Sequence, residues 1–220
     1  MDPDSRAVRI PVGNVRLEAD LVPAPARKGI VIFAHGSGSG RGSPRNRQVA
    51  SVLRARGLGT LLLDLLAAPE ARVDEVTAEY RFNIPLLTER LLAATDWLIT
   101  HFTPKGLRLG YFGASTGGAV AMIAAAQRPE VVGAIVLRGA RSDLGDSAAE
   151  QIRCPTLIVV GGKDEPVRKM NAETMRRLRC EKKLVIIPGA SHLFEESGTL
   201  EKVSELAADW FGRYLSLPGE

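Results

Sequence analysis

The sequence predicts an α/β fold in which a mostly parallel central sheet is covered by helices on both faces, and three observations predict it. Short apolar segments alternate with helical segments along the whole chain, as in βαβ units with right-handed crossovers. Several apolar segments, such as residues 29–34, carry almost no polar side chain, as expected for strands buried on both faces. The 220 residues, 45% hydrophobic and 25% charged, have the composition of a globular protein.

The first expected elements form an N-terminal antiparallel hairpin. Residues 6–10 and 14–22 are joined by a turn around Gly13 and Asn14, which are typical hairpin residues. Next we expect a strand at 29–34, a helix at 45–56, a strand at 60–64 and a long amphipathic helix at 83–102. The acid-rich residues 65–82 are expected to be irregular.

The same alternation continues through the second half of the chain. The expected strands are 107–112, 132–138, 156–160 and 183–187, and the expected helices are 116–127, 169–179 and 198–215. No linker, repeat or low-complexity stretch divides the sequence, so we expect residues 1–220 to form one domain.

Charge and composition exclude several classes of protein. The formal net charge of +4 is small for a nucleic-acid-binding protein. No apolar run approaches the roughly 18 residues of a transmembrane helix, and the residues that begin with Met-Asp-Pro-Asp contain no apolar region of the kind found in signal peptides. Cys154 and Cys180 lack metal-ligand spacing, so they are expected to be small buried hydrophobic residues. We therefore expect a cytoplasmic protein with no nucleic-acid or membrane partner.

The strongest chemical signal is the segment Gly113-Ala114-Ser115-Thr116-Gly117, which follows one expected strand directly and precedes a helix. A serine nucleophile must stand on a sharp turn, which requires small residues two positions before and after it. Both positions are glycine here. The alternative is that Ser115 only caps the helix, but the strand and helix on either side favour a nucleophile.

A nucleophilic serine needs a base, and the chain has three histidines. His192 follows the last expected strand, where a base can reach over the edge of the sheet. His35 precedes a glycine-rich turn, and His101 lies at a helix C-terminus, where a cation is favourable for structural reasons. We therefore predict that His192 is the base.

The acid that orients this base is predicted to be Asp164, which follows a buried strand and two glycines. Glu165 and Asp143 are rivals, although Glu165 precedes a proline and is expected to face solvent. The chain order Ser115, Asp164, His192 is the order found in one of the common families of serine triads.

The glycine-rich turn at 34–40 is the candidate oxyanion hole, with the backbone N–H groups of Ser37 and Thr116 as the donors. A phosphate or dinucleotide loop is the rival interpretation, but the turn lacks GxGxxG and GK[ST]. No tyrosine has a lysine four residues on, as a short-chain dehydrogenase requires. We therefore expect no cofactor and no metal, and interpret Asp64 as a turn or helix-capping residue.

These motifs together resemble the α/β-hydrolase superfamily, and especially its dienelactone-hydrolase-like branch. The segments that carry the resemblance are His-Gly-Ser-Gly-Ser-Gly at 35–40, Gly-Ala-Ser-Thr-Gly-Gly at 113–118, Val-Val-Gly-Gly-Lys-Asp at 159–164 and Gly-Ala-Ser-His-Leu-Phe at 189–194. Arg-Gln-Val-Ala at 47–50, Phe-Asn-Ile-Pro-Leu-Leu-Thr-Glu-Arg at 82–90 and Leu-Arg-Gly-Ala-Arg-Ser-Asp-Leu at 137–144 further resemble bacterial members that are sometimes joined to phosphoribosyltransferase domains.

The chain departs from this branch at the nucleophile. Dienelactone hydrolases use a cysteine where this chain has Ser115. The resemblance therefore implies a serine hydrolase of a small carboxylic ester, lactone or thioester. Only the short segment 141–153 stands where other members insert a cap, so no large cap domain is expected and the site should be open. The alternatives are a non-catalytic binding module and an acyltransferase or perhydrolase that uses the same residues.

An arginine cluster lies beside the expected site. Residues 29–63 contain no acid but five arginines: Arg41, Arg45, Arg47, Arg54 and Arg56. Arg41 and Arg45, together with Arg81, are candidates to attract a substrate that carries a carboxylate or phosphate. Alternatively, Arg47, Arg54 and Arg56 lie on a solvated helix face and offset the acids of 65–82. The expected partner is a small-molecule substrate. A homodimer is a common state for a domain of this size, although the sequence does not specify it.

Overall fold

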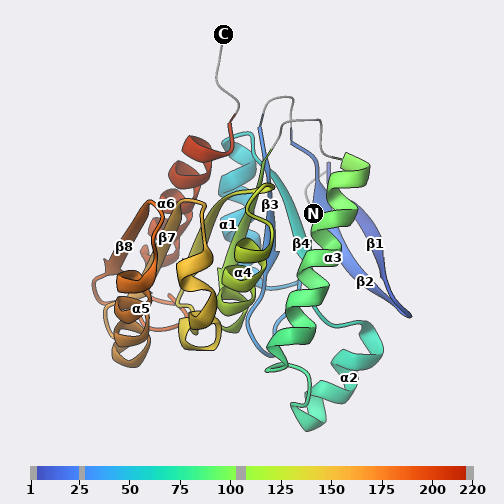
Figure 1. The fold of residues 1–220 in the computed structure, drawn as a ribbon, viewed down its shortest axis with the longest axis horizontal. Helices are drawn as coiled ribbons and strands as arrows, with labels where there is room; N and C mark the ends of the chain where they lie inside the picture. Colours follow the sequence, from blue (N-terminus) through green and yellow to red (C-terminus); the bar gives the residue numbers. More distant parts are fainter. Residues whose placement is uncertain (1–3, 25–27, 103–107, 217–220) are drawn as a thin grey trace.

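A computed structural model describes residues 4–24, 28–102 and 108–216, and its core is an eight-stranded sheet in the order β1-β2-β4-β3-β5-β6-β7-β8 (Figure 1). The strands are β1 (Arg6–Val12), β2 (Val15–Val22), β3 (Ile30–Ala34), β4 (Gly59–Leu63), β5 (Leu109–Ala114), β6 (Val132–Arg138), β7 (Thr156–Gly161) and β8 (Lys182–Ile187). The predicted N-terminal hairpin is present, because β1 pairs with β2 in antiparallel fashion around Gly13 and Asn14. β2 is also antiparallel to β4, and all the later pairs are parallel.

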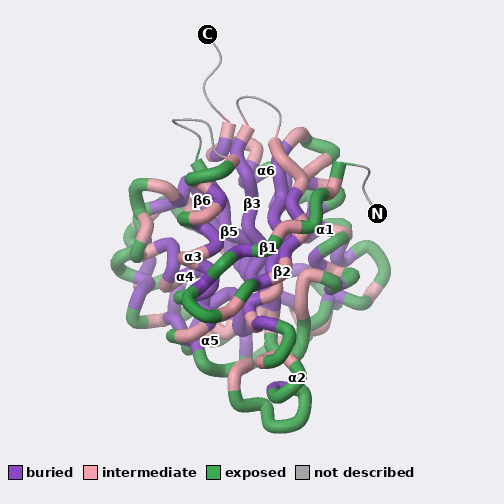
Figure 2. The backbone as a smooth tube through the Cα atoms, turned by 90° about the vertical axis from the view of Figure 1, so that its right-hand side faces the viewer, coloured by how far each residue is buried: buried purple, intermediate pink, exposed green. Residues whose placement is uncertain are grey.

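Helices cover both faces of the sheet, as the sequence predicts. They are α1 (Pro44–Ala55), α2 (Ala68–Thr77), α3 (Ile84–Phe102), α4 (Thr116–Gln127), α5 (Glu165–Arg177) and α6 (Thr199–Tyr214), with a 3₁₀ segment, η1 (Ser142–Gln151), between β6 and β7. One hydrophobic cluster joins the sheet to α3, α4, η1 and α5, and a second joins its other face to α1 and α6. The strands between these layers are the most buried part of the chain (Figure 2).

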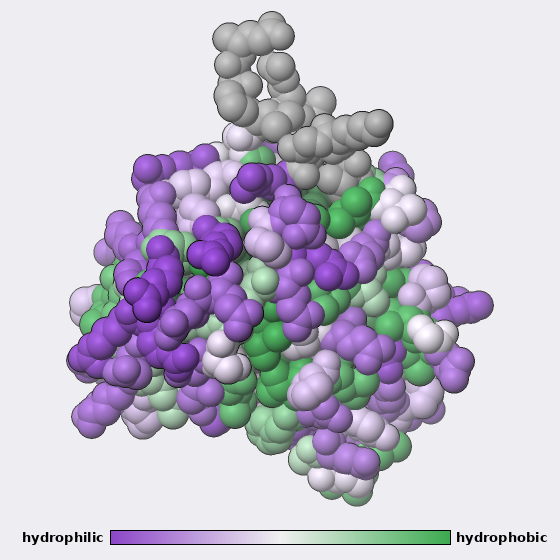
Figure 3. Space-filling view, viewed as in Figure 1, coloured by the Kyte–Doolittle hydropathy of each residue, from purple (hydrophilic) through white to green (hydrophobic). Residues whose placement is uncertain are grey.

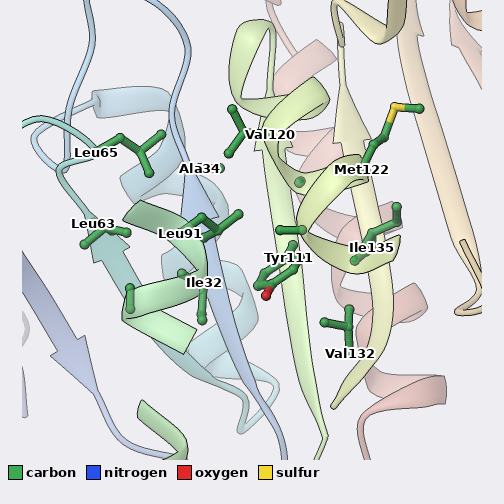
Figure 4. Packing of buried hydrophobic residues seen from close by; sticks show 14 of the residues in the cluster. Ile32, Ala34, Leu63, Leu65, Leu91, Tyr111, Val120, Met122, Val132 and Ile135 are labelled. Atoms are coloured by element: carbon green, nitrogen blue, oxygen red, sulfur yellow. The ribbon is translucent and has the colours of Figure 1, made fainter. Parts of the chain in front are cut away.

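The larger cluster shows why the central strands are apolar on consecutive residues. In Figure 4, Leu91 of α3 and Val120 of α4 lie over Ile32 and Tyr111 of β3 and β5. All four side chains are fully buried. The neighbouring residues along β3, such as Phe33, point to the opposite face and join the other cluster. Each strand residue therefore contacts one of two helix layers, which makes the carboxyl ends of these strands rigid supports.

The expectation that residues 65–82 are irregular is wrong, because they contain α2. This helix has almost no apolar face, and Asp74 is its one buried residue. Polar contacts hold it instead: Glu70 accepts a hydrogen bond from the amide of Ala67 at 2.7 Å and pairs with the buried Arg90 at 3.0 Å. Since helix prediction rests on apolar periodicity, a helix held by ion pairs at the edge of the fold escapes it (Figure 2).

The predicted start of the helix at 169 is also wrong, because α5 begins at Glu165. Pro166 lies in the first turn, where a proline is favourable because the N–H that it lacks would have no partner in the helix. This shift makes Asp164 the residue that precedes the helix. Between β6 and β7 the chain forms only η1, so no large cap domain lies there, as expected.

The surface of the α3–α5 side is uneven in hydropathy (Figure 3). Hydrophilic side chains gather over α5, whereas hydrophobic ones are exposed nearer the middle of this face. A groove there is lined by Ile84 and Leu92 of α3, Ile123 of α4 and Leu144 of η1. Among the helices described, none combines the length and the hydropathy needed to cross a membrane.

Candidate active site

Ser115 stands on a strained turn between β5 and α4. Its backbone has φ of 51° and ψ of −119°, a conformation that costs a non-glycine residue free energy and that clusters at functional sites. A Cβ on Gly117 would come within 2.1 Å of the carbonyl oxygen of Ala34, and one on Gly113 within 2.6 Å of the carbonyl oxygen of Gly117. The two glycines that the sequence singles out are therefore required by the close approach of β3, β5 and α4.

The structure brings Ser115, His192 and Asp164 together. The His192 Nε2 atom lies 3.2 Å from Oγ of Ser115, and its Nδ1 atom lies 2.5 Å from Oδ2 of Asp164. Because a carboxylate only accepts hydrogen bonds, Nδ1 carries the proton and donates it to Asp164. Nε2 is then free to accept the hydrogen bond from the Ser115 hydroxyl. The Asp164 side chain is 11% exposed and that of His192 is 37% exposed, so solvent reaches the ring.

The rival acids have other partners. Arg141 donates two hydrogen bonds to Asp143, at 2.9 and 2.8 Å, and these bonds hold the pKa of Asp143 below its usual value. Glu165 is exposed and forms an ion pair with Lys169 at 2.8 Å. His101 also has another partner, because its Nδ1 lies 2.7 Å from the Trp97 carbonyl oxygen within α3.

The loop that carries His192 is braced on both sides of the ring. A Cβ on Gly139, after β6, would lie 3.4 Å from the imidazole. Glu196 accepts hydrogen bonds from the amide and the hydroxyl of Ser191, and the bond from this amide is the main cause that lowers the pKa of Glu196. Phe194 is buried with φ of 56°. These contacts fix the ring beside Ser115.

His35 anchors the glycine-rich loop rather than taking part in the serine cluster. Its Nε2 accepts a hydrogen bond from the amide of Leu65 at 3.0 Å, so its Nδ1 donates to the Gly36 carbonyl oxygen at 2.9 Å. Burial lowers the pKa of His35 and keeps the ring neutral. The loop is thereby tied to the chain that follows β4.

The two predicted oxyanion donors lie on the two segments that meet at Ser115. Thr116 is the first residue of α4, so its N–H has no partner within the helix. Ser37 follows Gly36, on which a Cβ would lie 3.2 Å from that of Ser115. Ser37 and Ser115 also line one cavity of about 190 Å³ together with His192. One predicted donor is thus the residue that follows Ser115, and the other lines the same cavity.

All three candidate arginines have an acid partner, but two of them, Arg41 and Arg81, do not line the cavity of Ser115. Arg41 contacts Asp64 at 3.2 Å and Asp20 at 3.6 Å, and Asp64 also accepts a hydrogen bond from the Arg41 amide, as a turn residue does. Arg81 contacts the buried Asp74 at 2.9 Å. Both Asp64 and Arg81 line a separate hollow of about 480 Å³ on the α2 side of the glycine-rich loop, which Ser115 does not line.

Arg45, by contrast, lines the cavity that holds Ser115 and His192. The expectation that Arg47, Arg54 and Arg56 offset the acids of 65–82 is wrong for Arg47 and Arg56. Arg47 pairs with Asp20 of β2 at 3.5 Å, and Arg56 pairs with Asp209 of α6 at 3.2 Å. The helix α1 packs against β4 and α6, whereas Asp74 and Glu70 of α2 pair with Arg81 and Arg90.

Sequence reasoning missed Arg138 as a residue of this site. It is the last residue of β6 and is 6% exposed, and it lines the cavity with Ser115. Its backbone carbonyl oxygen accepts a hydrogen bond from the Ser115 amide at 3.0 Å. A cation that ends an otherwise apolar strand, at the edge of the sheet where ligands bind, is the signal that could have found it.

Cys154 and Cys180 lie apart from this site, and neither forms a disulfide. Cys154 is buried as expected, and burial raises the pKa of its thiol to about 12. Cys180 is only half-buried. Over residues 4–24, 28–102 and 108–216, no group of three or more His, Cys, Asp or Glu side chains is placed to hold a metal ion.

Comparisons with known proteins give a consistent family and fold. The family model described as "Dienelactone hydrolase family" matches residues 25–217. A crystal structure of dienelactone hydrolase from Anabaena variabilis is 51% identical, with a TM-score of 0.92, and the match covers 98% of this chain and 100% of that one. Est1E from Butyrivibrio proteoclasticus is 19% identical with a TM-score of 0.77 over 92% of this chain and 96% of that one, which shows the α/β-hydrolase fold.

Among curated proteins, one from Mycobacterium tuberculosis strain H37Rv, named "Putative phosphoribosyl transferase", is 44% identical over 212 residues. The match covers 96% of this chain but 47% of that protein. This chain therefore spans about half the length of the curated relatives that it matches.

Proposed function

The chain belongs to the dienelactone hydrolase family, and from this premise we propose that it is a serine hydrolase. Its reaction is the cleavage of a small carboxylic ester, lactone or thioester through an acyl-enzyme. The observation that carries the proposal is the His192 ring, whose two nitrogens lie within hydrogen-bonding distance of Ser115 and Asp164. A nucleophile, a base and a group that orients the base are the three parts that acyl transfer by a serine needs.

In the first half of the reaction, the Ser115 oxygen attacks the substrate carbonyl carbon and its proton passes to Nε2 of His192. Asp164 stabilises the imidazolium that forms, because its carboxylate accepts the hydrogen bond from Nδ1. The amides of Ser37 and Thr116 donate hydrogen bonds to the oxyanion. The tetrahedral intermediate collapses when the bond to the leaving group breaks, and the leaving group takes the proton from Nε2.

In the second half, His192 takes a proton from water, and the hydroxide oxygen attacks the carbonyl carbon of the acyl-enzyme. Collapse of this second intermediate breaks the bond to Ser115, whose oxygen recovers the proton, and releases the acid. The cavity of about 190 Å³ beside Ser115 suits a small acyl group. We also propose that residues 1–220 act as one domain, since two hydrophobic clusters cover the two faces of one sheet.

The phosphoribosyl transferase name of the Mycobacterium tuberculosis relative is not part of this proposal. More than half of that protein lies outside the match. The glycine-rich turn at 34–40 lacks the sequence patterns of a phosphate-binding loop, and His35 holds it against the chain after β4. The cluster at Ser115 supports acyl transfer instead.

The test is the turnover of 4-nitrophenyl acetate by the parent and by Ser115→Ala. If Ser115 and His192 act as a unit, kcat should fall by a factor on the order of 10⁴–10⁶, with unchanged folding by circular dichroism. Ser147→Ala, an exposed serine of η1, is the matched control and should keep the parent rate. Equal turnover by Ser115→Ala and the parent would remove Ser115 from the mechanism. A panel of short esters, lactones and thioesters then identifies the preferred acyl group.

A further inference from the structure

Arg138 is a buried cation without a carboxylate partner among the described residues. The residue is only 6% exposed, and its Nε and Nη1 atoms make no hydrogen bond to any of the described residues. Its guanidinium carbon lies 5.7 Å from the centre of the Phe194 ring, a contact that stabilises a cation only in part. A buried guanidinium with free donors is costly, so this arginine is poised to bind something else.

Arg45 of α1 adds a second cation to the same place. Its Nε atom is also buried and makes no hydrogen bond within the described ranges. Its Nη1 atom lies 3.4 Å from the carboxylate of the exposed Glu195. Arg45 and Arg138 line one cavity of about 190 Å³ with Ser115 and His192. Three guanidinium nitrogens without a hydrogen-bond partner in the described part of the chain therefore belong to residues that line the cavity of the attacking hydroxyl.

Both side chains carry charge when the enzyme works. Burial, and next the charge of Arg45, lower the pKa of Arg138 to about 10, which still leaves it protonated near neutral pH. Arg45 and Arg138 carry like charges and repel each other, and an anion bound by both would offset the repulsion and accept hydrogen bonds from the unsatisfied donors. A guanidinium binds carboxylate and phosphate oxygens with two parallel hydrogen bonds.

We propose that Arg138 and Arg45 form a subsite for an anionic group, a carboxylate or a phosphate, on the substrate whose carbonyl Ser115 attacks. The inference rests on the proposed hydrolase function and names its substrate class. Arg41 and Arg81 do not share this role, because both are paired with aspartates away from the cavity of Ser115. The site selects an acidic ester because a neutral one leaves the buried guanidinium of Arg138 without a carboxylate partner among the described residues.

The first test measures binding and needs no turnover. In a Ser115→Ala background, calorimetry gives the Kd of glutarate and of inorganic phosphate with Arg138 present and with Arg138→Met. We expect the preferred anion to bind about 10- to 100-fold more weakly to the Arg138→Met protein, and Arg138→Lys to recover part of the affinity. The comparison between glutarate and phosphate tells which anion the subsite prefers. Equal affinities with and without Arg138 would overturn the proposal.

Folding of the variant is checked by its melting temperature. Methionine can replace the unbranched apolar stem of arginine and carries no charge, so Arg138→Met should melt at the same or a higher temperature in the absence of anions. Glutarate or phosphate should raise the melting temperature of the parent and not that of the variant. If Arg138→Met does not fold, Arg138→Lys serves instead, and unaltered anion affinity in that variant would count against the subsite.

The second test measures selectivity in the active enzyme. The ratio of kcat/KM for mono-4-nitrophenyl glutarate to that for 4-nitrophenyl butyrate should exceed one in the parent and fall about 10- to 100-fold in Arg138→Met and Arg45→Met. Arg47→Met is the matched control, because Arg47 lies on the same helix but pairs with Asp20. A ratio that these three variants change alike would overturn the subsite. Failure of the parent to hydrolyse either ester would instead contradict the proposed function, and the binding test would still decide the subsite.

Discussion

The backbone amide of Leu65 donates a hydrogen bond to Nε2 of His35 at 3.0 Å. The bond joins the glycine-rich loop, which carries the amide of Ser37, to the chain that leaves β4. It requires an unprotonated Nε2, so the geometry of the predicted oxyanion hole depends on a neutral His35. Burial lowers the pKa of this histidine from its ordinary value of 6.5.

This dependence predicts how stability changes with pH. The unfolded chain binds a proton at His35 below about pH 6.5, whereas the folded protein resists it until a lower pH. The unfolded state therefore binds more protons in that range, and the free energy of unfolding must fall as the pH falls below 6.5. His35 alone contributes a slope of at most about 1.4 kcal/mol per pH unit.

Urea unfolding of the parent and of His35→Gln between pH 8 and pH 5 measures this slope. The variant should lose stability at pH 8, because glutamine cannot replace both hydrogen bonds of the ring, and its slope below pH 6.5 should be smaller. His101→Gln, at the exposed end of α3, is the control and should keep the slope of the parent. Parallel pH profiles for the parent and His35→Gln would show that His35 is not held neutral by the fold.

Gly117 should tolerate no side chain. A Cβ there would meet the carbonyl oxygens of Ala34 and His35 at 2.1 and 2.5 Å, and both are backbone atoms that cannot move aside cheaply. Gly117→Ala should lower the free energy of unfolding by about 1–3 kcal/mol and also lower esterase activity, because it displaces the glycine-rich loop.

The matched control is Gly212→Ala in α6, where no atom lies within 4 Å of the added Cβ. Alanine is the better helix former, so this variant should gain up to about 1 kcal/mol. Urea denaturation curves compare the two. A Gly117→Ala protein as stable and active as Gly212→Ala would mean that the close approach of α4 to β3 is not required.

Asp164→Asn should leave the fold intact and remove most of the activity. An asparagine amide that donates to Nδ1 of His192 favours the tautomer with the proton on Nε2, where it can no longer accept the Ser115 proton. We expect kcat for 4-nitrophenyl acetate to fall by a factor on the order of 10³–10⁴. Asp143→Asn and Glu165→Gln are the controls, because those acids are paired with Arg141 and Lys169. A larger loss in either control than in Asp164→Asn would make that residue the orienting acid.

Most of the sheet could be predicted from the sequence because burial on both faces leaves a strand no room for polar residues. The alternation of β3, α1 and β4 could be predicted for that reason. The turn at Ser115 could be predicted because close backbone contacts require its glycines. By contrast, α2 could not be predicted from apolar periodicity, because it is held by the ion pair of Glu70 with Arg90. The start of α5 could have been predicted from Pro166, because proline is favoured in the first turn of a helix, but the apolar periodicity alone placed the start later.

The arginines show the limit of sequence reasoning at the site itself. A cluster of cations within one stretch of sequence does not reveal which acid each one meets, since Arg41 and Arg47 reach across to Asp20 of β2. Arg138 lies far from Arg45 in sequence, and only the pairing of β6 with β5 places it beside Ser115. The partners of long charged side chains are set by tertiary structure.

The central claim, that Ser115 is a nucleophile activated by His192, is tested most directly by reaction with a fluorophosphonate, followed by intact-protein and peptide mass spectrometry. The claim predicts one adduct per chain on the peptide that contains Ser115. The adduct should be absent in Ser115→Ala, form much more slowly in His192→Gln, and form at the parent rate in Glu165→Gln. A folded parent protein that forms no adduct, or forms it on a residue other than Ser115, would contradict the account.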